Sequence, residues 1–127
     1  MKKILNLING QLIPPASDTY IDNYNPSNGS VYSLIPDSDE RDVEMAVAAA
    51  KNAFPMWRDM PKEKRSAILI RLSELIQRDL DKLALAESID NGKPLWLSKS
   101  VDIPRAVSNI HFYATAALHL HDEAYSM

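Results

Sequence analysis

The spacing of apolar residues changes near Asp37, and this change constrains the fold more than any other feature of the sequence. Before Asp37, short apolar runs alternate with turn residues, a pattern typical of strands. Asn9-Gly10 stands between two such runs and is the dipeptide that most strongly indicates a tight β-hairpin. We expect two antiparallel strand pairs, formed by residues 4–8 with 11–13 and by residues 19–24 with 31–35.

After Asp37, apolar residues recur at intervals of three or four, which indicates helices. The first helix is expected to begin at a cap supplied by Asp37 or Ser38. It is expected to end at Pro55, because a residue before proline avoids helical backbone angles. Phe54 and Trp57 are expected to pack in the core at this exit. The buried face of the helix is expected to hold Val43, Val47, Ala50 and Phe54.

The second helix is expected to begin near Pro61 with a solvated first turn at residues 62–65, and to stop at Asn91-Gly92. Asp79 or Asp81 can cap a new helical segment, so we expect a kink or break there. The apolar stripe that we expect in the core consists of Ile68, Leu69, Leu72, Leu75, Ile76, Leu80 and Leu83.

The third helix is expected over about residues 102–118, with Asp102 as its cap and Pro104 in its first turn. His119 and His121 are two positions apart and point to different sides of a helix, so we expect no metal site there. The tail over residues 119–127 is expected to fray.

The composition excludes several classes of function. The chain has 127 residues and a net charge of -3, so it lacks the basic surface that binds nucleic acid or anionic membranes. Having no cysteine, it offers no disulfide, no thiolate metal site and no cysteine nucleophile. Its three glycines are too scattered for a phosphate-binding loop. We find no signal peptide or membrane-spanning run, and we expect a cytoplasmic protein.

Five segments together carry a resemblance to a known family. They are Ile8-Asn9-Gly10-Gln11, Asn25-Pro26-Ser27-Asn28-Gly29-Ser30-Val31, residues 47–57 ending in Phe-Pro-Met-Trp, Lys64-Arg65 with the apolar stripe, and residues 87–94 ending in Gly-Lys-Pro. In this order and spacing, they resemble the N-terminal quarter of an NAD(P)-dependent aldehyde dehydrogenase. Within that family, the segments most resemble the dehydrogenases of 2-hydroxymuconic and 2-aminomuconic semialdehyde.

The resemblance implies a parent of the α/β, Rossmann-like aldehyde dehydrogenase fold. Taken alone, the chain is expected to be α+β, mostly helical with N-terminal β-hairpins. It would form one partial domain over residues 1–127, with β-hairpins in 1–36 and helices of an incomplete cofactor-binding domain in 37–127. The family's dinucleotide motif, general-base Glu and nucleophilic Cys lie downstream of these residues. We therefore expect a fragment that has no catalytic residue, binds no NAD and is inactive alone.

Arg105 is the candidate substrate-binding residue, with Val101 as its neighbour on a tunnel wall. The resemblance places Arg105 on the helix that lines the family's substrate tunnel, where a guanidinium would hold a substrate carboxylate through two hydrogen bonds. The alternative is a solvated arginine in a first helical turn. Against that alternative, a cation near a helix N-terminus is unfavourable by about 0.3–1 kcal/mol, which makes a functional reason more plausible.

Asp90 is the candidate ligand of a monovalent cation. The resemblance pairs its carboxylate with backbone oxygens of Asn23 and Tyr24, and hard cations prefer oxygen ligands. The alternative, which we favour for this chain, is that Asp90 orders the Asn91-Gly92 turn.

The sequence thus predicts part of an enzyme that oxidises a carboxylated, muconic-type semialdehyde to the acid with NAD+. Its expected partners are the rest of the dehydrogenase chain or further copies of itself, because its apolar helix faces would otherwise stay exposed. The alternative function is a stand-alone helical protein-interaction module.

Overall fold

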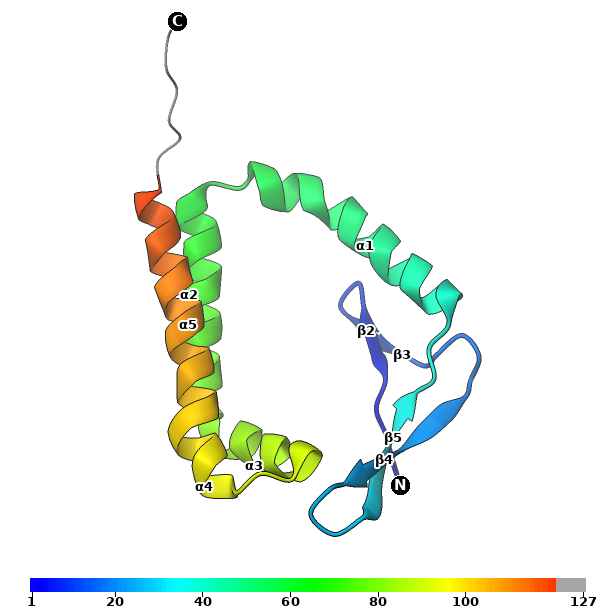
Figure 1. Cartoon of the computed structure of the whole chain (residues 1–127). Helices are drawn as coiled ribbons and strands as arrows, with labels where there is room; N and C mark the ends of the chain where they lie inside the picture. Colours follow the sequence, from blue (N-terminus) through cyan, green and yellow to red (C-terminus); the bar gives the residue numbers. More distant parts are fainter. Residues whose placement is uncertain (121–127) are drawn as a thin grey trace, which may run out of the picture. The chain divides into compact units, whose positions relative to one another are not determined.

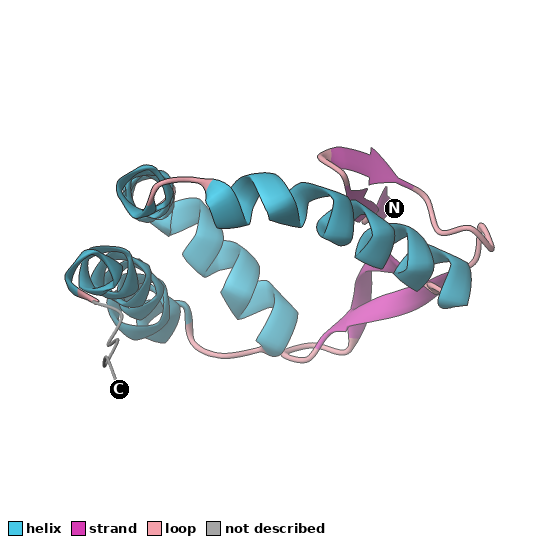
Figure 2. Ribbon diagram, turned by 90° about the horizontal axis from the view of Figure 1, so that it is seen from above, coloured by secondary structure: helices cyan, strands magenta, loops and turns pink. Residues whose placement is uncertain are grey.

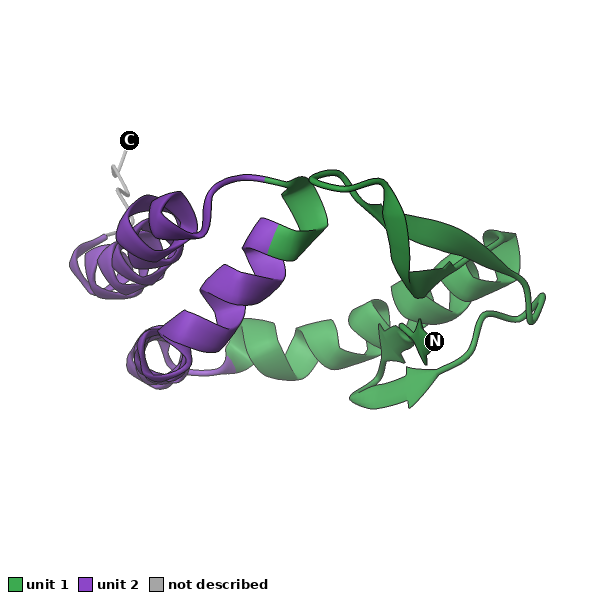
Figure 3. Cartoon of the chain, turned by 90° about the horizontal axis from the view of Figure 1, so that it is seen from below, with its two compact units in different colours: residues 1–59, 89–92 green, residues 60–88, 93–127 purple. Residues whose placement is uncertain are grey.

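A computed structural model describes residues 1–120 of the chain (Figure 1). The chain divides into two compact units, which are coloured separately in Figure 3. Unit 1 holds Met1–Asp59 and Ile89–Gly92, and unit 2 holds Met60–Ser88 and Lys93–Met127. The strands all lie in unit 1, and the expected α+β class with N-terminal hairpins is confirmed (Figure 2). A single partial domain over residues 1–127 stays a prediction.

The first hairpin of unit 1 forms as the sequence predicts. Strand β2 (Asn6–Ile8) pairs antiparallel with β3 (Gln11–Ile13). The turn residues Asn9 and Gly10 both have positive φ, at 50° and 75°. A type I′ turn requires this backbone at both central positions, and Asn-Gly adopts it at little cost.

The second strand pair is β4 (Tyr20–Asn25) with β5 (Ser30–Pro36), also antiparallel. A two-residue strand that the sequence analysis missed, β1 (Lys2–Lys3), lies parallel to β5 on its other side. Two lysines are too few to show the alternation typical of a strand. This strand is therefore defined only by its pairing with β5.

The ladder between β4 and β5 contains a bulge. Asn23 lies opposite Ser33, but the next residue, Tyr24, lies opposite Val31, so Tyr32 has no partner in the ladder. A bulge redirects the side chain of the extra residue. Tyr32 is that residue in β5.

Helix α1 (Glu40–Asp59) starts two residues later than Ser38, one of the two caps that we expected. The Arg41 N–H donates to Asp39 Oδ1 over 2.9 Å, and the Asp39 N–H donates to Asp42 Oδ2 over 3.0 Å. This reciprocal arrangement is a capping box in which aspartate fills both positions. The expected cap at Asp37 or Ser38 is therefore wrong.

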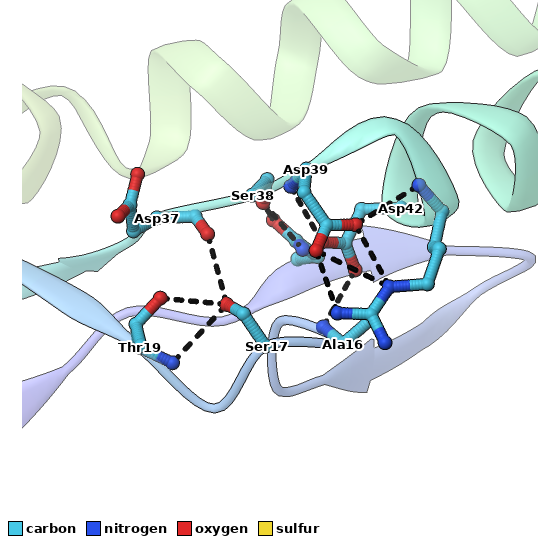
Figure 4. A network of polar contacts seen from close by, with 9 residues as sticks. Ala16, Ser17, Thr19, Asp37, Ser38, Asp39 and Asp42 are labelled. Atoms are coloured by element: carbon cyan, nitrogen blue, oxygen red, sulfur yellow. Dashed lines mark hydrogen bonds and ion pairs between the residues drawn. The ribbon is translucent and has the colours of Figure 1, made fainter.

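The two expected caps have other contacts, which hold the chain before α1 (Figure 4). Ser38 Oγ accepts a hydrogen bond from Asn6 Nδ2 over 2.9 Å. The Asp37 carbonyl accepts one from Ser17 Oγ over 3.0 Å. These bonds tie the β5–α1 connection to segments before β4.

Pro55 lies inside α1 and does not end it, which corrects the expected exit. A proline in a helix removes one backbone donor and disfavours the turn before it, so the continuation has a cost. The apolar face of α1 is also not in the core. Val43 is 59% exposed and Phe54 56% exposed, and Trp57 is 39% exposed. Among the described residues of unit 1, none buries this face, so the expected core packing of Phe54 and Trp57 is wrong.

Unit 2 contains α2 (Lys62–Arg78), most of α3 (Leu80–Asn91) and the long C-terminal helix. The expected break is confirmed at Asp79, whose carbonyl accepts the Leu83 N–H over 3.0 Å. The last helical residue before Gly92 is Asn91, as predicted.

The first turn of α2 is less solvated than expected. The Lys62 ammonium donates to the Leu118 carbonyl over 2.9 Å, and Arg65 donates to the Met60 carbonyl over 3.0 Å. Both side chains are half-buried. Each donates to a backbone oxygen near a helix end, where carbonyls lack helical partners.

The C-terminal helical run begins at Leu95, earlier than the sequence predicted. It consists of α4 (Leu95–Leu97), the π-helical η1 (Ser98–Asp102) and α5 (Ile103–His119). In η1, the Ile103 N–H donates to the Ser98 carbonyl, five residues before it. This wider turn directly precedes Pro104, and we attribute the accommodation of the proline inside the helix to it.

Helix α5 packs along α2, and Figures 1 and 2 show the two side by side. The helices approach closely because small side chains lie in the unit 2 core, where the least exposed residues are Ala84, Ala114, Ser66, Ser73 and Ser98. The larger stripe residues are only partly covered, and Ile68 and Leu72 are 48% and 42% exposed. The stripe is therefore core in part only. None of the helices within residues 1–120 is long and apolar enough to span a bilayer.

Candidate functional site

Arg105 and Val101 lie at the junction of η1 and α5 in unit 2. The Val101 side chain is half-buried, and the Arg105 side chain is exposed. Positions four apart on a helix share a face, so the two residues belong to one surface. Among residues 1–120, Arg105 forms no ion pair. Its guanidinium is therefore open to an anionic ligand.

The helix-dipole argument for a functional Arg105 depends on a helix that starts at Asp102, and the structure shows an earlier start. Asp102 has helical backbone angles, with φ −68° and ψ −52°, and makes no capping hydrogen bond. Because the helical run begins at Leu95, Arg105 lies well inside it, away from the positive end of the helix dipole. The expected cap at Asp102 and the dipole argument are both wrong. The substrate-binding role of Arg105 and Val101 stays a prediction.

Asp102 instead belongs to a charge cluster centred on Lys93. The Lys93 ammonium lies 2.6 Å from Asp102 Oδ2 and 3.1 Å from Glu87 Oε1. The side chains of Lys93, Asp102 and Glu87 are 26%, 28% and 40% exposed. Hydrogen bonds to Asp102 and then to Glu87 raise the pKa of Lys93 above its usual value. The ammonium therefore keeps its charge between the two carboxylates.

A hydrogen bond from a side chain fixes the backbone beside this cluster. Ser88 Oγ donates to the Lys93 carbonyl over 2.6 Å. The bond closes the connection between the end of α3 and the start of α4, which holds the stem of the lysine in place. A second contact, between Lys99 and Asp81 over 2.7 Å, also joins η1 to α3, but Asp81 is 82% exposed.

Asp90, in unit 1, is engaged by side chains on the bulged strand pair. Tyr32 donates its phenol proton to Asp90 Oδ1 over 2.6 Å, and Asn23 Nδ2 approaches the same oxygen at 3.4 Å. These bonds from Tyr32 and then Asn23 lower the pKa of Asp90, and the bond to Asp90 raises the pKa of Tyr32. Neither sequence interpretation of Asp90 included Tyr32.

The geometry limits how a cation would bind at Asp90. Because two donors occupy Oδ1, a monovalent cation would have Oδ2 and backbone oxygens available. The Tyr24 side chain points elsewhere, since its hydroxyl lies 3.4 Å from Asp22 Oδ2. The roles of Asp90, Asn23 and Tyr24 as cation ligands stay a prediction.

Gly92 ends α3 with φ +76°, the left-handed backbone that favours glycine at a helix C-terminus. A Cβ on this residue would lie 3.1 Å from Pro26 Cβ, so a side chain at this position would crowd the Asn-Pro turn. The two motif segments at 25–31 and 87–94 thus meet in unit 1 through Pro26 and Gly92.

Metal binding by histidine finds no support in residues 1–120. They contain no group of three or more His, Cys, Asp or Glu side chains arranged to hold a metal ion. His119 ends α5, and His121 lies outside the described residues.

Sequence reasoning missed the Lys93 cluster as a unit. Glu87 and Lys93 entered only as parts of a motif, and Asp102 entered as a helix cap. The signal that was available is the run of opposite charges on both sides of Gly92 and Pro94, which suggests that the helix ends are linked by ion pairs.

The sequence model of the aldehyde dehydrogenase family matches residues 12–127. This chain belongs to that family. The chain is 43% identical over 122 residues to 2-aminomuconic semialdehyde dehydrogenase of Bos taurus, covering 96% of this chain and 25% of the relative. It is 34% identical over 125 residues to 5-carboxymethyl-2-hydroxymuconate semialdehyde dehydrogenase of Escherichia coli, covering 98% of this chain and 26% of the relative.

The fold of the chain agrees with solved members of the family. It superposes on the crystal structure of PnpE in complex with nicotinamide adenine dinucleotide with a TM-score of 0.94 and 29% identity. That match covers 100% of this chain and 26% of the PnpE chain. The chain spans about a quarter of the length of the curated relatives that it matches.

Proposed function

We propose that this chain is the N-terminal part of an NAD-dependent dehydrogenase that oxidises a carboxylated, muconic-type semialdehyde to the acid. The observation that carries the proposal is the exposed Arg105 guanidinium, which forms no ion pair among residues 1–120 and shares a helical surface with Val101. The names of the two relatives support it, because each relative acts on a muconate-type semialdehyde.

In this proposal, the residues of the chain bind and orient the substrate. The guanidinium of Arg105 holds the carboxylate at the end of the substrate remote from the aldehyde through two parallel hydrogen bonds. The half-buried Val101 contacts the carbon chain. Holding the remote end fixes the distance and direction of the aldehyde carbon relative to the reacting groups. Those groups belong to parts of the enzyme outside this chain.

NAD+ accepts the hydride of the aldehyde in such an enzyme. In this proposal, NAD+ binds to parts of the enzyme outside this chain. The placement of the glycines supports this, because Gly10, Gly29 and Gly92 lie in separate turns of unit 1 and form no phosphate-binding loop within residues 1–120. We place the enzyme in the cytoplasm, and we propose that the rest of the dehydrogenase chain covers the apolar faces of α1 and α2.

The test is the substitution Arg105→Ala in the complete dehydrogenase, measured with a carboxylated semialdehyde and with a neutral aldehyde of similar length. Loss of a charge-assisted pair should raise KM for the carboxylated substrate roughly tenfold or more. The KM for the neutral aldehyde should stay unchanged. The control is Arg78→Ala, because Arg78 is an exposed arginine at the end of α2 that pairs with Asp79. Equal effects of Arg105→Ala on both substrates would refute the proposal.

A further inference from the structure

A carboxylate in the same helical run, that of Asp102, could compete with the substrate carboxylate for the Arg105 guanidinium. Asp102 lies three positions before Arg105, and an aspartate and an arginine at this spacing are neighbours that pair favourably. Such a pair would neutralise the guanidinium and turn it toward the helix. In the structure, this pair does not form, although both residues have a helical backbone.

Lys93 accounts for the missing pair. Its ammonium lies 2.6 Å from Asp102 Oδ2, so the carboxylate of Asp102 already has a cationic partner. We propose that Lys93 is a positioning residue that holds Asp102 away from Arg105 and thereby keeps the Arg105 guanidinium available for a ligand carboxylate. This inference rests on the proposed function of Arg105.

The geometry favours Lys93 over Arg105 as the partner of Asp102. Lys93 is anchored on its other side by Glu87 at 3.1 Å, and its backbone carbonyl is held by Ser88 Oγ at 2.6 Å. The lysine is therefore already oriented, and little side-chain freedom is lost in the contact with Asp102. With exposed fractions of 26% and 28%, Lys93 and Asp102 are also screened less than a surface pair.

The backbone of η1 positions the surface that carries the candidate site. Asp102 is the last residue of η1, and Val101 precedes it directly. A π-helical turn changes the angular position of all residues that follow it, so the side chains of α5 depend on how η1 is held. The backbone hydrogen bond from the Ile103 N–H to the Ser98 carbonyl holds this turn, so the side chain of Asp102 can be changed without moving Arg105.

The chain offers a matched control for this effect. Lys99 of η1 pairs with Asp81 of α3 over 2.7 Å, but the two side chains are 42% and 82% exposed. This pair joins η1 to α3 without involving Lys93 or Asp102. Exposed pairs of this kind contribute little, so its removal should leave the substrate affinity unchanged.

The test uses four variants of the complete dehydrogenase: Lys93→Met, Lys93→Arg, Asp102→Asn and the double variant Lys93→Met with Asp102→Asn. With Lys93→Met, Asp102 is free to pair with Arg105, and KM for the carboxylated semialdehyde should rise roughly two- to fivefold. The kcat and the KM for a neutral aldehyde should not change. Lys93→Arg should behave like the unsubstituted enzyme, because it keeps the cation.

The double variant decides between pairing and simple loss of structure. Removing the charge of Asp102 removes the competitor, so the double variant should return KM for the carboxylated substrate to its original value. Asp102→Asn alone and the control Asp81→Asn should have the original KM as well. A double variant that stays impaired, or a Lys93→Met variant equally impaired on both substrates, would overturn the role of Lys93.

Arg105→Ala in the same assays separates the two proposals. If Arg105→Ala raises KM for the carboxylated substrate selectively but Lys93→Met does not, the proposed function stands and the inference about Lys93 fails. If Arg105→Ala has no selective effect, the proposed function fails and the inference fails with it.

Discussion

The buried carboxylate of Asp42 joins the start of α1 to the loop that follows β3. The residue is 3% exposed, and its two oxygens accept hydrogen bonds from the Ala16 N–H and the Asp39 N–H, each over 3.0 Å. One aspartate thus satisfies a donor of the loop and a donor at the helix start. Because one carboxylate accepts both part-buried hydrogen bonds, Asp42 holds the loop and the helix start together.

We expect Asp42→Ala to lower the free energy of unfolding by about 1–3 kcal/mol, because it removes the acceptor of two part-buried hydrogen bonds from backbone N–H groups. Urea denaturation followed by circular dichroism measures this change. Glu44→Gln is the control, since Glu44 is exposed on the same helix, and it should change stability by less than about 0.5 kcal/mol. Equal stability of both variants would show that Asp42 is not a structural acceptor.

The bond between Tyr32 and Asp90 makes the stability of unit 1 depend on pH at both ends of the range. The pKa of Asp90 is lowered in the folded state, so its contribution is complete above its unfolded value of about 3.9 and is lost as pH falls through the folded value. The pKa of Tyr32 is raised, so its contribution is complete below about 10 and is lost as pH rises through the folded value.

The substitution Tyr32→Phe tests this dependence, because it removes the phenol proton that Asp90 accepts. We expect the thermal midpoint of Tyr32→Phe to lie below that of the unsubstituted chain between about pH 5 and pH 9. The difference should shrink below about pH 4 and above about pH 10. Tyr24→Phe is the control, since the Tyr24 hydroxyl makes only a 3.4 Å contact on the surface. A difference that does not vary with pH would contradict the assignment.

At the scale of elements, local signals predicted hairpins and breaks but not the ends of long helices. Asn9-Gly10 and Asp79 act through their own backbone preferences, which do not depend on distant residues. Pro55 was expected to end α1, because local preference disfavours a helix there. The helix nevertheless continues to Asp59, which the local preference alone does not predict.

The candidate site shows the same division. Arg105 was found because its side chain is a sequence property, but its environment was misjudged. The helical run begins at Leu95 and includes a π-helical turn, whereas the sequence predicted a start at Asp102. The side chain of Asp102 pairs with Lys93 and does not cap a helix. The π turn has no local sequence signal, because it differs from an α turn by one residue in the hydrogen-bond pattern. The Tyr32–Asp90 contact likewise depends on a bulge that periodicity does not mark.

The proline inside α1 gives a prediction at this scale. Pro55→Ala restores a backbone donor in the helix interior and should raise the free energy of unfolding by about 1–3 kcal/mol. Pro61→Ala is the matched control, because Pro61 stands before the first residue of α2, where its missing N–H has no helical acceptor. The comparison uses chemical denaturation of both variants. A destabilised Pro55→Ala variant would show that the helix needs the fixed proline angle.

At the scale of the whole molecule, the uncovered apolar side chains set the behaviour in solution. Unit 1 exposes Val43, Val47 and Phe54 on α1, and unit 2 exposes Ile68 and Leu72 on α2. The second pair belongs to an apolar groove on α2 that is also lined by Ala67, Arg71 and Leu75. Contiguous exposed apolar surface of this kind promotes association.

We therefore expect the isolated chain to self-associate. Sedimentation velocity should show a sedimentation coefficient that rises with protein concentration, because the apolar faces of separate molecules bury one another. Leu72→Glu should weaken the association, since it places a charge in the α2 groove, whereas Gln77→Glu on the same helix should not. A single monomeric species at high concentration would count against this expectation.

Unit 1 is built from two stretches of chain, and Gly92 of the second stretch closes against Pro26 of the first. During synthesis, the ribosome must therefore produce residues 60–88 before the N-terminal unit receives its last segment. Until then, Asn23 and Tyr32 lack their hydrogen bonds to Asp90, and the first 59 residues lack the segment that completes unit 1. The order of translation thus makes the early part of this protein dependent on a segment that is made later.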